Sequence, residues 1–581
     1  MTKEPSLAYF GPGNPTTEEE ALELVEANVR TYGHVAVDCE TISIKDKTCI
    51  GVGYSCREHR VYLSVESDYF DRALELAANP HVLKIYHNAM FDLIVLHMVG
   101  QRYGVVLPDW HNIDDTSIMA QVQGLPANLA ELTALTLARE IKEISDILPE
   151  RSTMLDVAFE ITAHKCADDI KATEDIYFKM GGPEWRDRTN PHDWQPIQST
   201  QFGIDMSMPS NLHVSTRIKD CYEVDRVLLP ILDRMGGRGV ALRQDKLEAW
   251  YSKLSRERMA YRDACSKEGF NPGSPQQVGY MLAVRGNILP FTRSRKQLVT
   301  DNEHLRDLDD PLAHMVLAYR RMDKLLGTYI KPCLEMEAGR FFSYYRLDLA
   351  TGRLASSDRN FQNIPPEVRN IFQPDSGIFS AADASQIEMR VWAHISQDPI
   401  MLRAFADGED IHAVTQQALW PGSDPEDKAA RRLAKNFNFA VIGDASAKTL
   451  STDNHLPVKQ CTEYKEAWLA RYPVGAKYIR RRAEERGPWS ETEFGRRMRL
   501  PDPVTRGEKH VSNCRQNYPL QGTAADIIKK AMLTVNKWVY EQAPGTVKLL
   551  MQVHDELVFE IKTECVEQYT TEICQLMSDA A

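Results

Sequence analysis

The segment LLMQVHDELVFEI, residues 549–561, contains the pattern on which the fold of this chain depends. Apolar residues lie on both sides of a His-Asp-Glu triplet, which is typical of a β-hairpin with charged residues at its tip. A second apolar strand is expected in IFSAADASQIEMR, residues 378–390, where it ends at Asp383 and leads into a helix. A hairpin tip lying against this strand end would bring Asp555 close to Asp383, and the two carboxylates would suit a two-metal clamp on nucleotide phosphates. A solvated turn is the alternative for the triplet alone.

The segment RRLAKNFNFAVIG, residues 431–443, adds a basic and aromatic stripe. Arg431, Lys435 and Phe439 are four residues apart, so they lie on one side of a predicted helix. Like charges at this spacing cost ~0.2–0.5 kcal/mol when no anion is present. A triphosphate across Arg431 and Lys435, with its base or sugar against Phe439, would satisfy the stripe. An amphipathic helix with basic residues at its edge is the alternative.

The N-terminal region contains a separate set of acidic residues. Three short strands are predicted within residues 33–65, and Asp38 and Glu40 project from the same side of the first one. Such like charges repel each other unless a cation lies between them. Asp92 and Asp169 lie on predicted helices, and four carboxylates brought together could hold two Mg²⁺ ions for the attack of water on a phosphodiester. A solvated strand end is the alternative, because an Asp-X-Glu pattern is a weak motif.

The composition restricts the class of protein. The chain has 581 residues, of which 43% are hydrophobic and 26% charged, which excludes a disordered or collagen-like protein. Its net charge of -13 excludes a global basic surface for nucleic acid, although a local basic cleft is allowed. Residues 480–499 include seven arginines that could contact DNA phosphates, with a solvated helix as the alternative.

The cysteines and the N-terminus indicate a reducing compartment. The 11 cysteines include no Cys-X-X-Cys pair, so they are expected to be small buried residues rather than disulfides or zinc ligands. The N-terminus is typical of neither a signal peptide nor a transit peptide. No run of apolar residues approaches the ~18 needed to cross a membrane. We therefore expect a soluble intracellular protein with no membrane partner.

Taken together, the C-terminal motifs resemble DNA polymerase family A. DASQIE is similar to motif A of that family, the Arg-Lys-Phe stripe to motif B, and VHDE to motif C. The similarity extends to two further segments, TGRLASSDRNFQNIP (351–365) and NYPLQGTAADIIKKAM (517–532). The N-terminal segments VAVDCET, HNAMFD and KCADDIKAT resemble the three motifs of the DEDD 3′–5′ exonucleases, which have a ribonuclease-H-like fold. The combination is similar to a phage- or bacterial-type polymerase without a 5′-nuclease domain.

The resemblance implies a multidomain α/β fold. A ribonuclease-H-like exonuclease domain would be followed by a right-hand polymerase with palm, thumb and fingers. The expected boundaries are 1–180 for the exonuclease domain, 181–221 for a linker or insertion, 222–340 for the thumb, 341–400 for the first part of the palm, 401–510 for the fingers, and 511–581 for the second part of the palm.

The resemblance also assigns roles to single residues. Glu388 would crowd the sugar 2′ position and disfavour ribonucleotides, and Phe439 implies poor acceptance of dideoxynucleotides. Arg431 and Lys435 would contact the triphosphate, with Lys435 as the acid for the pyrophosphate leaving group. Primer–template contacts are implied for Arg353, Gln521 and His554. Metal ligation is implied for Asp383 and Asp555 in the polymerase and for Asp38, Glu40, Asp92 and Asp169 in the exonuclease.

Four departures from the family patterns are present, and the first is Ala384, which stands where motif A usually has Tyr. Lys165 stands where the polymerase-linked exonucleases have Tyr, while His164 has the spacing of the His-bearing branch. Our hypothesis is that His164 orients or deprotonates the attacking water, with a surface histidine as the alternative. Gly443 and Asp444 replace the usual Tyr-Gly after motif B, which predicts lower fidelity and weaker sugar selection. The chain ends 25 residues after Glu556, so we expect a short terminal palm segment.

The sequence thus predicts a template-directed DNA polymerase that adds dNTPs to a primer and proofreads with a 3′–5′ exonuclease. Two Mg²⁺ ions are expected in each centre, with Mn²⁺ as a substitute, and primer–template DNA and dNTPs are the expected partners. We expect a monomer in the cytoplasm of a bacterial or phage-infected cell. The main alternative is a 3′–5′ exonuclease whose degenerate polymerase region only binds DNA, and a non-enzymatic replication scaffold is a third reading.

Overall fold

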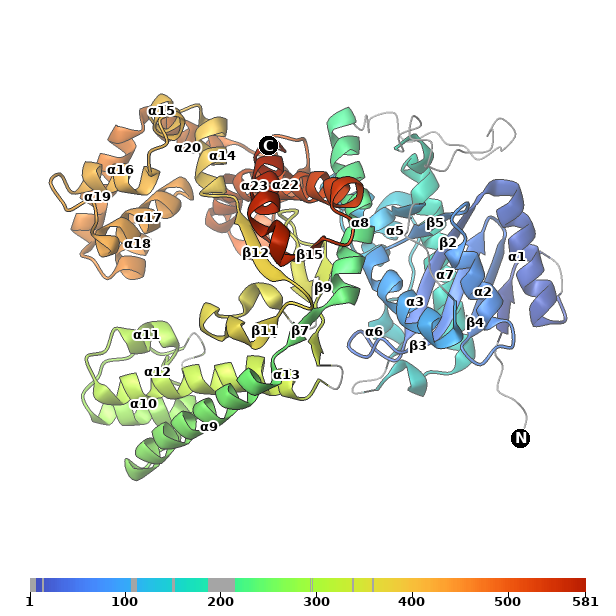
Figure 1. Cartoon of the computed structure of the whole chain (residues 1–581), viewed down its shortest axis with the longest axis horizontal. Helices are drawn as coiled ribbons and strands as arrows, with labels where there is room; N and C mark the ends of the chain where they lie inside the picture. The colour runs from blue at the N-terminus through green and yellow to red at the C-terminus, as the bar shows by residue number, and fades with distance from the viewer. Residues whose placement is uncertain are drawn as a thin grey trace.

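The computed structural model describes residues 7–12, 15–105, 112–148, 152–185, 215–292, 294, 296–336, 339–357 and 360–580. Most of the predicted linker, residues 186–214, lies outside this range. Figure 1 shows an N-terminal domain on the right, a small central sheet, and two helical groups on the left, one above the other.

The N-terminal domain is built on a six-stranded sheet of order β1-β4-β3-β2-β5-β6. The strands β1 to β4 pair antiparallel, whereas β5 and β6 run parallel to β2. Because helices pack on it, β2 is buried along nearly its whole length. The strands are β1 (Leu7–Phe10), β2 (His34–Thr41), β3 (Cys49–Cys56), β4 (His59–Ser64), β5 (Leu83–Tyr86) and β6 (Ile113–Asp115).

The helices of this domain have clear local signals. The hydroxyl of Thr17 caps the start of α1, and Gly33, with a φ of 75°, ends the same helix and turns the chain into β2. The long helix α7 packs against β2 and β3 and therefore faces the strand that carries Asp38. The elements are α1 (Glu18–Tyr32), α2 (Phe70–Ala78), α3 (Ala89–Tyr103), α4 (Thr116–Gln121), α5 (Leu129–Leu137), α6 (Ile144–Ile147), η1 (Met154–Asp156), α7 (Phe159–Lys179) and η2 (Gly182–Glu184).

A helical arm follows over residues 244–334, so it begins later than residue 222, where the sequence predicts its start. Its helices α9 and α12 pack along each other, and a separate small core of apolar residues fills the tip of the arm. Ser274 caps α10 and Pro275 occupies its first turn, so the NPGSP segment begins a new helix. The arm contains α9 (Gln244–Lys267), α10 (Pro275–Val284), α11 (Asn302–Arg306), α12 (Pro311–Lys324), η3 (Leu325–Ile330) and α13 (Lys331–Leu334). The helix before it, α8 (Thr216–Arg238), packs instead against α3 of the N-terminal domain and against the helix at residues 508–542.

The central sheet has the order β12-β16-β15, with all pairs antiparallel. The strands β15 (Val547–Val553) and β16 (Glu556–Ile561) form the predicted hairpin, and β12 (Ile378–Asp383) is the predicted partner strand. Three helices pack beside them: α14 (Ile387–Ser396), α22 (Glu508–Gln542) and α23 (Val566–Asp579). The elements β7 (Val240–Leu242), β8 (Arg340–Phe341), β9 (Tyr344–Arg346), β10 (Ala355–Ser357), η4 (Phe361–Asn363), η5 (Pro366–Ile371), β11 (Phe372–Gln373) and η6 (Thr563–Cys565) complete the region.

A second helical group lies above the arm in Figure 1. Aspartates at positions 398, 410 and 427 cap its helices, and Trp392, Trp468 and Phe437 fill its core. Its helices are α15 (Pro399–Ala406), α16 (Ile411–Leu419), α17 (Lys428–Ile442), α18 (Ala447–Asn454), α19 (Val458–Arg471) and α20 (Pro473–Glu484), and β13 (Trp489–Glu491), β14 (Arg497–Arg499) and α21 (Pro503–Arg506) follow.

The short hairpin β13–β14 contacts the N-terminal domain. The backbone N–H of Arg497 donates to the carbonyl of Val122, 3.0 Å away, just after α4 of the N-terminal domain. Arg496 beside it is buried and donates to Asp225 on α8 and to Asp526 on α22. The expectation that all seven arginines of residues 480–499 are free to meet DNA is therefore wrong for Arg496, because buried carboxylates already neutralise it.

Several sequence predictions are confirmed by these elements. The three strands within residues 33–65 and the strand at Val82–Tyr86 are present, although β1 and β6 were not expected. All 11 cysteines lie in the described part of the chain, where nine of them are buried and none forms a disulfide. Across the described part of the chain, none of the helices combines the length and the apolar character that crossing a membrane requires.

Candidate active sites

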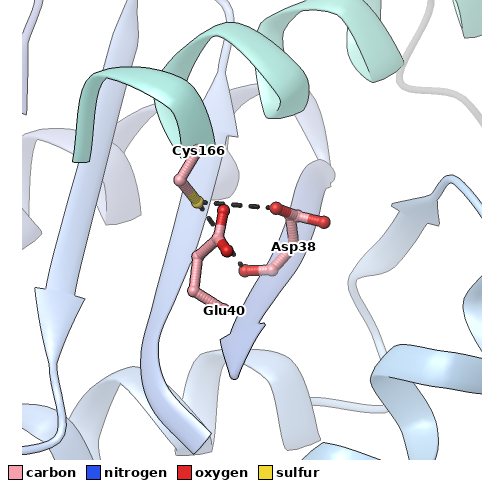
Figure 2. Close-up of side chains that lie close together, drawn as sticks. All are labelled: Asp38, Glu40 and Cys166. Atoms are coloured by element: carbon pink, nitrogen blue, oxygen red, sulfur yellow. Dashed lines mark hydrogen bonds between the residues drawn. The ribbon is translucent and has the colours of Figure 1, made fainter. Parts of the chain in front are cut away.

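The first centre forms where α7 crosses β2. One ligand atom each of Asp38, Glu40 and Cys166 lies within 4.8 Å of the others, and Figure 2 shows the three side chains pointing toward one another. Gly53 on β3 lies opposite Asp38, and a Cβ added to it would lie 2.3 Å from the Cys166 sulfur. The absence of a side chain at Gly53 therefore lets α7 approach the acidic strand.

Asp92 and Asp169 complete the predicted set of four carboxylates. Asp92 is 2% exposed and accepts a hydrogen bond from the backbone N–H of Cys39 at 2.8 Å. On α7, Asp169 accepts from Lys165 Nζ at 2.5 Å, and the same nitrogen lies 3.6 Å from Glu40 Oε1. The fold thus brings all four predicted acids to one place and adds a buried lysine.

The electrostatics of this centre show a shortage of positive charge. Burial, with the charge of Glu40 added to it, raises the pKa of Asp38 to about 6 despite the opposing effect of Lys165. Burial likewise raises the pKa of Asp169 to about 6 and the pKa of Asp92 well above its usual value. Glu40 Oε1 is buried without a hydrogen-bond donor. One lysine among four clustered carboxylates leaves the oxygen donors short of positive charge, which fits a hard divalent cation.

Cys166 is a poor ligand for such a cation. Burial and the charge of Asp38 raise the pKa of the Cys166 thiol well above its usual value, so the sulfur keeps its proton. It lies 3.7 Å from Asp38 Oδ2, at the distance of a weak hydrogen bond. The four carboxylates are therefore the groups suited to hold a metal here.

His164 faces a different environment from Lys165. It is exposed, and its ring packs edge-on against Phe10 of β1 with the ring centroids 4.7 Å apart. Of the two neighbours, Lys165 is the residue with ion pairs to the carboxylates. The proposed action of His164 on water stays a prediction.

The second centre lies at the end of the central sheet. Asp383 pairs in register with Glu556, and the N–H of Ala384 donates to the carbonyl of Asp555 at 3.0 Å. Burial, followed by the charge of Glu388, raises the pKa of Asp555, and Asp383 adds to the effect while Arg353 opposes it. The predicted approach of the hairpin tip to the strand end is thus present, and it places Asp383 and Asp555 at the same end of the sheet.

A cavity of about 250 Å³ opens beside this centre. Its lining includes Asp555, His554, Arg353 and Glu388. Arg353 donates through its guanidinium to Glu388 in a close ion pair. The sequence placed both residues near the substrate but did not predict this pair, because they lie 35 positions apart with no local pattern linking them.

The basic stripe on α17 forms as predicted. Lys435 Nζ lies 5.9 Å from the centre of the Phe439 ring. Arg431 forms an ion pair of 2.6 Å with Asp410, so an anion of the chain itself offsets one of the two like charges. Burial, together with the charges of Arg431 and Lys435, lowers the pKa of the adjacent His412 to about 4 against the opposing effect of Asp410, so this histidine is neutral.

The motif B departures have a local structural consequence. Gly443 ends α17, and a Cβ at this position would lie 3.3 Å from the side chain of Asn517. Asp444 has a φ of 55°, a conformation that aspartate tolerates, and it forms an ion pair with Lys465 at 3.3 Å. Gln521 lies partly buried on α22, on the same helix as Asn517.

Comparison with known proteins agrees with this geometry. Residues 243–581 match the family model for DNA polymerase family A, and residues 14–181 match the family model for a 3′–5′ exonuclease. The chain is similar to DNA polymerase I of Pseudomonas aeruginosa, with 30% identity over 94% of this chain and 61% of the relative. It is also similar to the thermostable DNA polymerase I of Thermus filiformis, with 35% identity over 62% of this chain and 46% of that protein.

The chain thus spans about half of the length of these bacterial relatives. A solved structure, the POL domain of Pol1 from M. smegmatis in complex with DNA primer-template and dNTP, has the same overall fold. The two agree with a TM-score of 0.73 at 21% identity, over 98% of this chain and 96% of that one.

Proposed function

Because the chain belongs to DNA polymerase family A and carries a 3′–5′ exonuclease domain on the N-terminal side, we propose that it extends primers on a DNA template and proofreads them. The convergence of Asp383 and Asp555 at one end of the central sheet supports the proposal most directly. The separate acidic cluster around Asp38 supports the proofreading part. Paired carboxylate centres suit in-line reactions at phosphorus.

The proposed domains follow the expected boundaries. Residues 222–340, which include the arm and most of α8, are the thumb. Residues 401–510 form the fingers, and the sheet and helices of 341–400 and 511–581 form the palm. In Figure 1 the two helical groups project to the same side of the central sheet, one above and one below, which supports these assignments.

In the proposed polymerase reaction, the primer 3′ hydroxyl attacks the α-phosphate of a dNTP and pyrophosphate leaves. Arg431 and Lys435 bind the triphosphate from α17, and Lys435 protonates the leaving group. Before the nucleotide arrives, Asp410 holds Arg431 in an ion pair. Phe439 offers its ring to the sugar or base, next to Lys435.

Selection of the nucleotide is assigned to the residues around the 250 Å³ cavity. Glu388 crowds the sugar 2′ position, and the ion pair with Arg353 fixes its carboxylate. Arg353, Gln521 and His554 contact the primer–template near the new base pair. His554 lies at the exposed hairpin tip, which supports such a contact.

In the proposed exonuclease reaction, water attacks the terminal phosphodiester of a primer. Asp38, Glu40, Asp92 and Asp169 bind the metal, and His164 orients or deprotonates the water. The exposed side of α7, where His164 lies, is open to solvent and so to a strand end.

Members of both families use divalent metals, and we propose Mg²⁺ in each centre, with Mn²⁺ as a substitute. A bound Mg²⁺ supplies positive charge for the phosphate oxygens and lowers the pKa of the attacking hydroxyl or water. Asp383 and Asp555 would hold two ions in the polymerase centre. Because the substrate is DNA, the proposed place of action is the cytoplasm of a bacterial cell.

Primer extension tests the proposal. The chain is incubated with a labelled primer–template and Mg²⁺, with and without dNTPs, beside the variants Asp383→Ala and Asp38→Ala. We expect Asp383→Ala to lose primer extension but to keep primer degradation. Asp38→Ala should lose primer degradation but keep primer extension. Degradation without any extension by the unmodified chain would instead support an exonuclease whose polymerase region only binds DNA.

A further inference from the structure

Lys165 is an unusual residue within the exonuclease centre. It lies on α7, is 8% exposed, and directs its ammonium at the acidic cluster. Its Nζ is 2.5 Å from Asp169 Oδ2 and 3.6 Å from Glu40 Oε1. A lysine ammonium paired with two carboxylates carries a positive charge, so Lys165 brings a fixed cation into the cluster.

This ammonium lies between two of the four proposed metal ligands. A divalent ion bound to both Glu40 and Asp169 would compete with Lys165 for the same carboxylate oxygens, since the three are already in contact. The oxygens of Asp38 and Asp92 have other neighbours: the Cys166 thiol weakly contacts Asp38, and a backbone N–H contacts Asp92. Among the described residues, the ion pairs of the Lys165 ammonium are thus with Glu40 and Asp169, and Asp38 and Asp92 form none with it.

We propose that Lys165 is a built-in cation of the exonuclease centre, where it takes the place of one divalent ion. It holds Glu40 and Asp169 together, and the centre then binds a single ion through the oxygens that the ammonium leaves uncovered. Lys165 is thus a positioning residue of the acidic ligands. This inference rests on the proposed exonuclease function, because it assumes that the cluster binds a metal.

Counting bound Mn²⁺ tests the inference without any activity measurement. The full chain carries Asp383→Asn and Asp555→Asn, so that the polymerase centre does not contribute, and free Mn²⁺ is measured by electron paramagnetic resonance. We expect this background to bind one ion and the addition of Lys165→Met to raise the number to two. Lys165→Arg, which keeps the charge, should stay at one ion.

Lys171 provides a matched control on the same helix. It forms an ion pair with Asp175 at the same four-residue spacing but on a half-exposed side of α7. Lys171→Met should leave the count at one ion. If Lys165→Met binds the same number of ions with the same affinity as the background, the inference is overturned.

Two further outcomes are decisive. Asp38→Asn in the background should abolish Mn²⁺ binding, and if no bound ion depends on Asp38, both the exonuclease proposal and this inference fail. If Lys165→Met binds the same number of ions as the background, and the bound ion depends on Asp38, only the proposed role of Lys165 is refuted. The variants are compared in saturating Mn²⁺, because a second Mn²⁺ should supply the positive charge that Lys165→Met removes. Failure of Lys165→Met to stay folded under that condition also refutes the inference.

Discussion

Replacing Asp225 with asparagine should destabilise the polymerase region more than any surface change on the same helix. Asp225 lies on α8 and is 2% exposed. Its carboxylate accepts two hydrogen bonds from Arg496, at 2.6 and 3.0 Å, and one from Lys529 at 2.7 Å. Asp526 supplies the second acid of the cluster, so two buried cations face two buried carboxylates.

The asparagine leaves two buried cations with one carboxylate. Breaking such a buried pair costs about 3–5 kcal/mol. Each kcal/mol shifts Tm by roughly 2–4 °C in domains of 150–250 residues, and by less in larger ones, so we expect a fall of about 6–10 °C. Asp220→Asn removes the same charge from an exposed position on α8. It should change the free energy of unfolding by less than ~0.5 kcal/mol.

Differential scanning calorimetry of both variants measures the effect. Burial alone would raise the pKa of Asp225, but Arg496 and Lys529 hold it below its usual range. The contribution of Asp225 is therefore present above the pKa of an unfolded aspartate and is lost as the pH falls through the lower folded value. A Tm of Asp225→Asn within 2 °C of that of Asp220→Asn at pH 7.5 would refute this reasoning.

Three other changes have expected outcomes. Gly53→Ala places a Cβ 2.3 Å from the Cys166 sulfur, so it should cost about 1–3 kcal/mol by thermal melting, and Cys166→Ala in the same chain should restore most of the loss. An unchanged Tm in the single variant would show that α7 is not held that close to the sheet. Arg353→Met frees Glu388, so the ratio of kcat/KM for dCTP over CTP should fall by about tenfold, and an unaltered ratio would remove Arg353 from sugar selection. The pKa of Asp38 is raised to about 6, so the folded state holds an extra proton between roughly pH 4 and 6 and loses stability as the pH rises. In EDTA, Asp38→Asn should therefore raise Tm more at pH 7.5 than at pH 5, and an equal change at both values would contradict this.

The local patterns predicted the elements that carry the acids. The hairpin around His554 and the strand that ends at Asp383 follow from alternating apolar residues and a polar tip, and both form as expected. The same holds for the strand with Asp38 and Glu40, because side chains two apart on a strand share a face.

The charge partners were not predictable in the same way. Arg496 pairs with Asp225, which is 271 positions away, and its burial depends on three elements that meet only in the folded chain. The family motif showed Lys165 to be unusual, but its contact with Glu40 depends on the packing of α7 against β2. Periodicity describes single elements, whereas these ion pairs depend on how distant elements pack.

Anomalous X-ray diffraction from crystals of the chain soaked in Mn²⁺ measures the central claim most directly, namely that distant acids gather into two metal-binding centres. We expect anomalous density between Asp383 and Asp555, and a separate feature beside Asp38 and Asp92. Absence of density from either group at saturating Mn²⁺, or carboxylates too far apart to share an ion, would contradict the account for that centre.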